Sequence, residues 1–303
     1  MYHYRTFLSL GALLVTTIFL PACFPFVLSP RNRRHTALNA KISVKRDGKE
    51  FKLDFELVNA PLGNVPLVVL HGGPGLPRDY LLPLKDIVKD RPILFHDQLG
   101  CGNSDRPQES SLYSIEDSVN DLIALLNELK FDHFHLYGQS YGGILAFEYL
   151  KKVQPSNCLS VTLSSAPSSI PLVKKEWDRL TTDIRKQTPP ILVEDTFRRQ
   201  HVCRTFVVPK ALQKAYENAS TSWGGIDVIQ DYEASISTRF GTPPALVTRG
   251  EFDFVTQENL AVWEKCFVNV ETKELSGCSH HGLLENPELY GGVLNGFLER
   301  YDI

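Results

Sequence analysis

A serine with a glycine on either side is the feature of this sequence best suited to covalent catalysis. Gly-Gln-Ser-Tyr-Gly-Gly occupies residues 138–143, so glycines stand two positions before and two positions after Ser140. A serine on so tight a turn has a strained backbone, which requires small neighbours at these positions. The turn places its hydroxyl beside the N-terminus of a following helix, where free N–H groups favour a developing anion. The pattern predicts a nucleophilic serine.

The flanking residues have the patterns of the strand and helix that such a turn joins. Residues 134–137 form a short apolar run typical of a buried strand, and residues 144–150 have helical spacing. Gly-x-Ser-x-Gly between a strand and a helix is the nucleophile elbow of the α/β-hydrolase fold. This context argues against a chance Gly-Ser-Gly loop.

A glycine-rich turn is the candidate for stabilising the oxyanion. His-Gly-Gly-Pro-Gly at residues 71–75 follows a continuous apolar run at residues 66–70, which suits a central parallel strand. In this fold, the turn after the third strand and the residue after the nucleophile each donate one backbone N–H to the oxyanion. Gly73 and Tyr141 are therefore the predicted oxyanion hole, and Gly72 is a candidate substrate-binding residue.

An acid and a histidine follow the serine in the chain order that the fold requires. Asp253 comes just after a strand predicted at residues 245–248, and His280 precedes a helix predicted at residues 287–301. We predict that Asp253 and His280 complete a catalytic triad with Ser140. Histidine then acts as the general base, and the aspartate orients it.

Three further titratable residues, two of them near the predicted acid and base, have other predicted roles. Glu251 is the alternative acid and His281 the alternative base, because each lies within two positions of the favoured residue. Asp97 begins Asp-Gln-Leu-Gly-Cys-Gly-Asn-Ser after a strand predicted at residues 92–95. We predict a structural role for Asp97, which ties its loop to backbone N–H groups.

Together these motifs resemble those of the proline iminopeptidases and tricorn-associated aminopeptidases. The resemblance covers roughly residues 44–301, including Phe-Arg-Arg-Gln-His-Val-Cys-Arg at residues 197–204. It implies a serine peptidase that removes N-terminal residues, often proline, from short peptides. Carried over position by position, the resemblance implies the same catalytic residues: Ser140, Asp253, His280, Gly73 and Tyr141.

Two departures from the family pattern concern the substrate's free amine. The family has a glutamate directly after the triad aspartate, where this chain has Phe254. A second family glutamate lies in the cap, where the matching stretch at residues 224–228 has Asp227 instead. A buried ammonium without a counter-charge is costly, so with one acid fewer the binding of a free amine is predicted to be weakened by half, unless Glu217, Asp231 or Glu251 supplies the second charge. Phe254, Asp227 and Trp223 are the candidate substrate-binding residues.

The order of elements predicts an α/β fold with a mainly parallel central sheet and an inserted helical cap. The core is predicted at residues 41–166 and 242–303, and the cap at residues 167–241. An antiparallel pair at residues 41–57 turns at Asp-Gly, and residues 117–129 form an amphipathic helix. A further short strand is predicted at residues 267–270.

Helices are predicted within the cap at residues 168–185, 193–204, 209–218 and 227–235. A cap over the elbow excludes water and shapes the substrate pocket. The large aromatic residues of the cap and the acid loop are candidates for an apolar pocket: Trp177, Phe197, Phe206, Trp223 and Phe254.

Composition fits one catalytic domain. The 303 residues, of which 43% are hydrophobic, support a large core, and the net charge of -3 gives no basis for binding nucleic acid. The six cysteines show no metal-ligand spacing, so neither a metal nor a cofactor is predicted. The expected partner is a small peptide or ester substrate; the sequence leaves the oligomeric state open.

The N-terminus has the pattern of a targeting segment. Residues 1–23 have an apolar run after Arg5, as in a signal peptide or a membrane anchor. Residues 24–40 contain arginines and no acid, as in a transit peptide or tether. The two parts together resemble the presequences of secondary plastids, and export is the other predicted destination. Contact with a membrane is expected only if the segment is retained or Cys23 is lipidated, and a cytoplasmic location is less favoured.

Three function classes fit these observations. The favoured class is a serine hydrolase, an aminopeptidase of proline-iminopeptidase type. The alternative is a carboxylesterase or lipase-like enzyme acting on apolar esters or N-blocked amides. The remote alternative is a ligand-binding receptor on the same fold, against which the complete set of triad residues argues.

Overall fold

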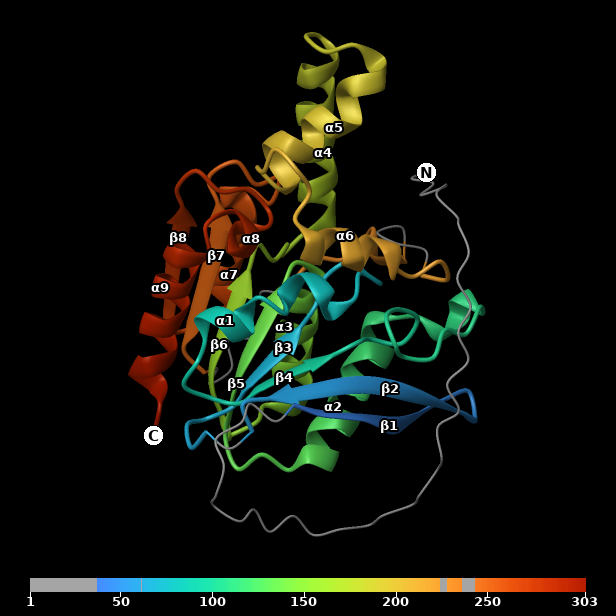
Figure 1. Cartoon of the computed structure of the whole chain (residues 1–303), viewed down its shortest axis with the longest axis vertical. Helices are drawn as coiled ribbons and strands as arrows, with labels where there is room; N and C mark the ends of the chain where they lie inside the picture. Colours follow the sequence, from blue (N-terminus) through green and yellow to red (C-terminus); the bar gives the residue numbers. More distant parts are fainter. Residues whose placement is uncertain (1–36, 61, 224–227, 236–242) are drawn as a thin grey trace. The chain divides into compact units, whose positions relative to one another are not determined.

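The computed structural model describes residues 37–303 except 61, 224–227 and 236–242 (Figure 1). The predictions for residues 1–23, for most of residues 24–40 and for Asp227 lie outside the described residues. Within the described ranges, no helix is both long and apolar enough to span a membrane.

An eight-stranded sheet runs through the described part of the chain, in the order β1-β2-β4-β3-β5-β6-β7-β8. β1 and β2 pair antiparallel, as do β2 and β4, and every pairing from β4 to β8 is parallel. The strands are β1 (Leu38–Arg46), β2 (Lys49–Val58), β3 (Leu67–Leu70), β4 (Ile93–His96), β5 (Phe134–Gln139), β6 (Cys158–Ser164), β7 (Ala245–Gly250) and β8 (Val270–Leu275). The predicted, mainly parallel sheet is confirmed.

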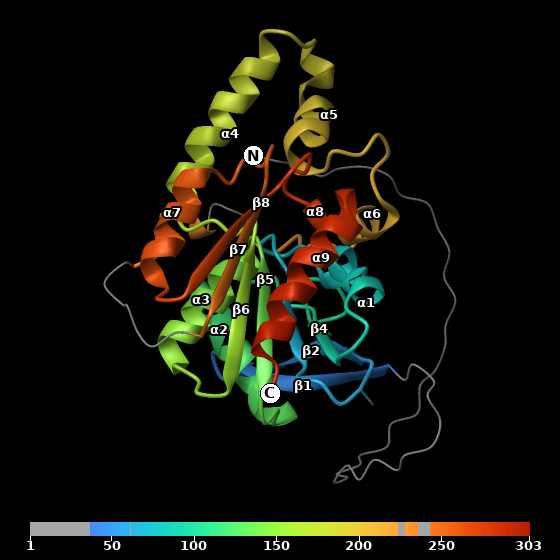
Figure 2. The same cartoon turned by 90° about the vertical axis from the view of Figure 1, so that its left-hand side faces the viewer.

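Helices cover both faces of this sheet, with α2, α3 and α7 on one face and α1 and α9 on the other (Figure 2). The helices are α1 (Leu84–Ile87), α2 (Ile115–Leu129), α3 (Tyr141–Val153), α4 (Ile170–Arg185), α5 (Val193–Phe197), α6 (Lys210–Glu217), α7 (Gln257–Cys266), α8 (Gly282–Glu285) and α9 (Pro287–Leu298). Because both faces are covered, β3, β4 and β5 are buried along their whole length, as their continuous apolar runs predict.

The hairpin of β1 and β2 shows how local sequence sets local structure. Asp47 and Gly48 have φ angles of 49° and 74°, the left-handed conformation that a two-residue turn between twisted strands requires. The predicted turn is therefore confirmed.

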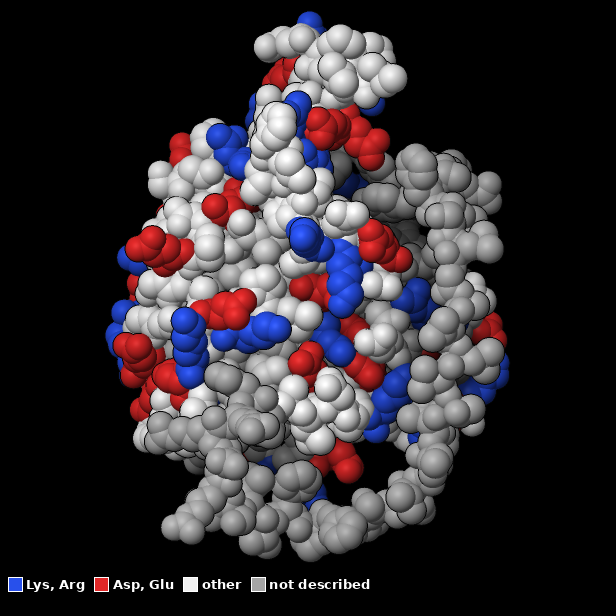
Figure 3. Space-filling view, viewed as in Figure 1, with Lys and Arg blue, Asp and Glu red and all other residues white. Residues whose placement is uncertain are grey.

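On the face shown in Figure 3, outside the grey atoms, acidic and basic side chains are interspersed.

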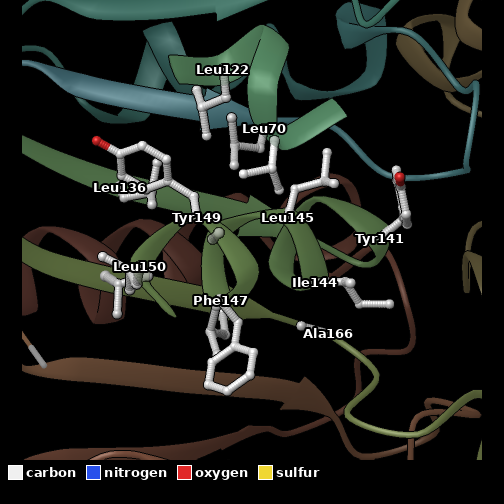
Figure 4. Packing of buried hydrophobic residues seen from close by; sticks show 14 of the residues in the cluster. Leu70, Leu122, Leu136, Tyr141, Ile144, Leu145, Phe147, Tyr149, Leu150 and Ala166 are labelled. Atoms are coloured by element: carbon white, nitrogen blue, oxygen red, sulfur yellow. The ribbon is translucent and has the colours of Figure 1, made fainter. Parts of the chain in front are cut away.

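Helix α3 packs between two parts of the core. Leu145 points toward Leu70 and Leu122, whereas Phe147 points to the opposite side (Figure 4). There the Phe147 ring lies 4.9 Å from that of Trp263 in α7, centroid to centroid. Burial of apolar side chains on both sides of α3 fixes the helix, and with it the turn that precedes it.

Helices α4, α5 and α6 lie in the stretch of chain between β6 and β7 that the sequence predicts as a cap. Figures 1 and 2 show α4 and α5 beyond the end of the sheet where the parallel strands finish. The helix predicted at residues 193–204 ends as α5 at Phe197 and continues as a π-helical turn, Arg198–Val202.

Two local predictions are wrong, and one strand was not predicted. In the helix predicted at residues 227–235, the described part forms a short turn and a bridge from Glu233 to Ser169, because its backbone pairs with the base of α4. The strand predicted at residues 267–270 begins only at Val270, since Phe267 ends α7. The sequence reading also omitted β6, which carries serine and threonine among its apolar residues.

Candidate active site

Ser140 occupies the sharp turn between β5 and α3. Its φ of 54° and ψ of -123° are unusual for a residue with a side chain. A Cβ atom at Gly138 would overlap the carbonyl of Gly142, and one at Gly142 would overlap the carbonyl of Leu70. Both glycines are thus required by close backbone contacts, and together they hold Ser140 in the strained conformation of a nucleophile elbow.

The turn after β3 comes close to this serine. A Cβ atom at Gly72 would lie only 2.9 Å from the Cβ of Ser140. The Gly72 N–H already donates to the Tyr80 hydroxyl at 2.7 Å, which leaves Gly73 as the predicted donor from this turn. Tyr141 is the first residue of α3, where a backbone N–H has no partner within the helix. The placement of both segments suits an oxyanion hole.

The structure brings Asp253 and His280 together. The His280 Nδ1 donates to Asp253 Oδ1 over 2.9 Å, and the side chains of His280 and Asp253 are 7% and 0% exposed. The Val255 N–H also donates to Asp253 Oδ1, at 2.9 Å, and fixes the carboxylate. An aspartate bonded at Nδ1 leaves the other ring nitrogen of His280 available to take a proton from a serine.

The alternative acid and base have other partners. Glu251 is exposed and accepts a hydrogen bond from the Gly277 N–H at 2.9 Å. His281 is buried edge-on to the Tyr80 ring, with 5.1 Å between centroids. Burial, with His280 beside it, lowers the pKa of His281 well below its usual value, so this ring stays neutral. The carboxylate that reaches an imidazole in this group is that of Asp253.

Two residues that the sequence reading missed link the parts of the site. The Tyr80 hydroxyl donates to Gln139 Oε1 at 2.6 Å, and Gln139 Nε2 donates to the His280 carbonyl at 3.1 Å. With the bond from Gly72 to Tyr80, one chain of hydrogen bonds joins the oxyanion turn, the elbow and the histidine loop. Burial raises the pKa of Tyr80, which keeps its proton available for donation. Gln139 occupies a variable position of the serine motif and Tyr80 lies outside every motif, so no sequence pattern pointed to a role for either residue.

Asp97 has the structural role that its motif predicts. Its carboxylate accepts hydrogen bonds from the backbone N–H groups of Arg78 at 3.1 Å and Asn103 at 2.9 Å. The Arg78 guanidinium also pairs with it at 3.1 Å. A Cβ atom at Gly102 would overlap this carboxylate, which explains the glycine at that position.

Aromatic side chains cover one side of the candidate base. The Phe254 ring stacks on the His280 ring with 4.2 Å between centroids and 26° between planes. Trp177 of α4 contacts Phe254 edge-on at 5.1 Å, and Phe197 of α5 lies 4.0 Å from Trp177. Two cap helices and the acid loop therefore build one aromatic cluster on the base.

The other two aromatic candidates lie elsewhere. Trp223 is 7% exposed, packs 5.5 Å from the Tyr141 ring and donates its indole N–H to the Leu99 carbonyl at 3.2 Å. Its contacts are those of a packing residue behind the oxyanion segment. Phe206 is 86% exposed, so the prediction that it lines a pocket is wrong.

Other catalytic groups are not assembled in the described part of the chain. Within it, no three histidine, cysteine or acidic residues gather as a metal site would require. Its cysteines are buried free thiols whose pKa values burial raises, which disfavours the reactive thiolate. These cysteines are Cys101, Cys158, Cys203, Cys266 and Cys278.

Comparison with known proteins first defines the class. The family pattern described as the alpha/beta hydrolase fold matches residues 65–192. A crystal structure of proline iminopeptidase from Mycobacterium smegmatis matches with a TM-score of 0.74 at 23% identity, covering 86% of this chain and 98% of that one. An esterase from Thermogutta terrifontis matches with a TM-score of 0.66 at 20% identity, covering 87% and 99%. The protein is an enzyme of the α/β-hydrolase fold.

Relatives in sequence then give the family. A proline iminopeptidase of Heyndrickxia coagulans is 29% identical over 277 residues, which is 82% of this chain and 95% of the relative. The proline iminopeptidase of Thermoplasma volcanium is 30% identical, covering 81% and 92%, and that of Lactobacillus helveticus is 31% identical, covering 78% and 90%. The chain belongs to the proline iminopeptidase family.

Proposed function

We propose that the protein is a serine aminopeptidase that releases N-terminal residues, proline among them, from short peptides. The observation that carries the proposal is the hydrogen bond from His280 to Asp253 in a chain whose Ser140 sits on a strained elbow. Family membership supports the choice of peptide substrates.

The mechanism follows from the geometry. Ser140 attacks the carbonyl carbon of the scissile bond while His280 takes its proton, and Asp253 stabilises the imidazolium that forms. The N–H groups of Gly73 and Tyr141 receive the oxyanion. His280 then passes the proton to the leaving amine, and water releases the acyl group from the serine.

An esterase is the second candidate, and one contact favours it. Phe254 stacks on His280 at the position where the family has a glutamate, and the side chains packed behind it are the apolar rings of Trp177 and Phe197. An uncharged acyl group fits beside such a surface with no ammonium to neutralise.

A parallel assay separates the two candidates. The substrates are proline and alanine amides with free or acetylated N-termini, together with short-chain and long-chain esters. We expect the largest kcat/KM for the free proline amide. Hydrolysis of only the esters and acetylated amides would replace the aminopeptidase with the esterase.

The substitution Phe254→Glu sharpens this assay. A carboxylate at this position supplies a partner for the substrate's ammonium, and one such pair in a partly dry site is worth roughly 1–3 kcal/mol. We expect the preference for a free over an acetylated N-terminus to rise about tenfold or more. Phe254→Leu, which adds no charge, is the control and should leave the preference unchanged.

For the N-terminal segment we propose targeting, on the basis of the apolar run in residues 1–23 and the acid-free stretch after it. Mass spectrometry of the N-terminus in the native source tests this. We expect the mature chain to begin between Cys23 and Lys41. A protein that keeps its first residues and has no membrane attachment would contradict the proposal, and a lipid on Cys23 would select the lipoprotein.

A further inference from the structure

A short cap segment lies across both loops that carry the candidate acid and base. We name residues 198–204 the clamp segment; it comprises the π-helical turn Arg198–Val202 with Cys203 and Arg204. The acid loop follows β7 and holds Asp253, and the histidine loop follows β8 and holds His280. The clamp segment contacts each loop through hydrogen bonds, and it contacts the acid loop through an aromatic ring as well.

The histidine loop docks on the backbone of the clamp segment. The His280 N–H donates to the His201 carbonyl at 3.4 Å, and the His281 N–H donates to the Val202 carbonyl at 3.0 Å. Arg204 Nε donates to the Gly277 carbonyl at 3.1 Å. The backbone of the candidate base is therefore bonded directly to the cap.

The acid loop docks on side chains of the same segment. His201 Nδ1 donates to the Phe252 carbonyl at 2.9 Å, next to Asp253 in the chain. The Arg204 guanidinium lies 3.7 Å from the centre of the Phe252 ring, within the range of a cation–π contact. His201 thus contacts the acid loop through its ring and the histidine loop through its carbonyl.

Apart from the bond between Asp253 and His280 themselves, the backbone hydrogen bonds between the two loops lie further from the reacting groups. The Phe252 N–H donates to the Cys278 carbonyl at 2.9 Å, and the Glu251 N–H to the Leu275 carbonyl at 3.1 Å. These bonds align the loops where they leave the sheet. The clamp segment adds bonds nearer the tips, because it contacts the Phe252 carbonyl, next to Asp253, and the His280 N–H together.

We propose that His201 is a positioning residue that holds Asp253 and His280 in their correct relative positions. Arg204 supports the same two loops through its contacts with Gly277 and Phe252. The proposal rests on the triad of the proposed function. A bond lost between His201 and Phe252 frees the acid loop to shift, and small displacements of catalytic groups are expensive in rate. Substrate contacts remain, so the loss falls on kcat and not on KM.

The test compares His201→Leu with His201→Asn. The two replacements are of similar size, but only asparagine keeps an N–H donor at the same number of bonds from Cα as His Nδ1. We expect His201→Leu to lower kcat about tenfold with KM within twofold of wild type, as one hydrogen bond implies. His201→Asn should recover most of kcat. His133→Leu, on the loop before β5, is the matched control and should leave both constants unchanged.

Arg204→Met gives a second measurement if His201→Leu unfolds. It keeps an apolar stem over Phe252 and removes the Nε donor to Gly277, and we expect a drop in kcat of about threefold. Equal rates in wild type and His201→Leu, or equal losses in the Leu and Asn variants, would overturn the proposal.

Labelling with a fluorophosphonate separates this proposal from the function on which it rests. A wild type that is not labelled at Ser140 would reject the triad itself. A wild type that is labelled, with His201→Leu labelled at the same rate, would reject only the positioning role.

Discussion

Ser140 and His280 are held in place in two different ways. The conformation of Ser140 is enforced by its own neighbours, because Gly138 and Gly142 have no room for a side chain. His280 is held by partners from distant parts of the chain: Asp253 is 27 positions away and Gln139 is 141 positions away. The nucleophile is therefore specified by local sequence, and the base by tertiary contacts.

The largest effect on the hydrolysis rate is expected at the nucleophile, which local sequence specifies. Ser140→Ala removes the nucleophile while the elbow keeps its glycines, so the fold should persist and the rate should fall on the order of 10³-fold or more. Hydrolysis assays and fluorophosphonate labelling measure this loss. Labelling that persists in the variant would place the nucleophile elsewhere.

At the base, which tertiary contacts hold, His280→Ala should lower the rate nearly as much as Ser140→Ala, because serine and histidine act as a unit. His281→Ala should keep most activity, since its buried neutral ring packs on Tyr80 and does not bond Asp253 in the described contacts. Comparing kcat/KM for the two variants tests the assignment. The reverse ranking would move the base by one residue.

The local control of the elbow can be broken directly with Gly138→Ala. The added Cβ overlaps the carbonyl of Gly142, so we expect a loss of about 3 kcal/mol in the free energy of unfolding. Gly296→Ala in α9, where a Cβ meets no atom within 4 Å, is the matched control and should be neutral or slightly stabilising. Urea unfolding of both variants gives the difference. A loss below about 0.5 kcal/mol for Gly138→Ala would show that the backbone of the elbow can shift to accommodate the added Cβ atom.

The contrast between local sequence and tertiary contacts also explains which parts of the site could be predicted from the sequence. The elbow and the strand before it were predictable because glycine spacing and apolar runs are local patterns. Asp253 and His280 were predictable by chain order within the fold. Tyr80 and His201 were not, because their roles depend on hydrogen bonds to distant backbone groups.

Errors in the fold have a similar origin. The helix predicted at residues 227–235 failed because backbone groups there pair with residues 168–170, a contact that no local pattern encodes. The strand β6 was overlooked because its serine and threonine residues weaken the apolar signal, although Ser164 bonds Tyr290 and Ser160 bonds His135 inside the fold.

The smallest expected effect concerns buried histidines beside the oxyanion turn. His71 Nε2 accepts the Gln98 N–H at 2.9 Å, which requires a neutral ring. Burial lowers the pKa of His71 to about 3 and that of His96 to about 4. The unfolded chain takes up protons on both rings as the pH falls through about 6.5, whereas the folded chain does not until far lower pH. Folding stability is therefore lost as the pH falls below about 6.5.

Asp121 opposes this trend in part. Burial raises its pKa to about 6, so the folded state gains a proton there before the unfolded state does, and stability rises as the pH falls through that value. Two histidines outweigh one aspartate, and we expect a net loss of roughly 2 kcal/mol between pH 7 and 5.5. Urea unfolding at the two pH values measures it, and His96→Gln should remove well over half of the loss. Equal or greater stability at pH 5.5 in the wild type would mean that these rings are protonated in the folded protein, and that the oxyanion turn is held by something other than a neutral His71.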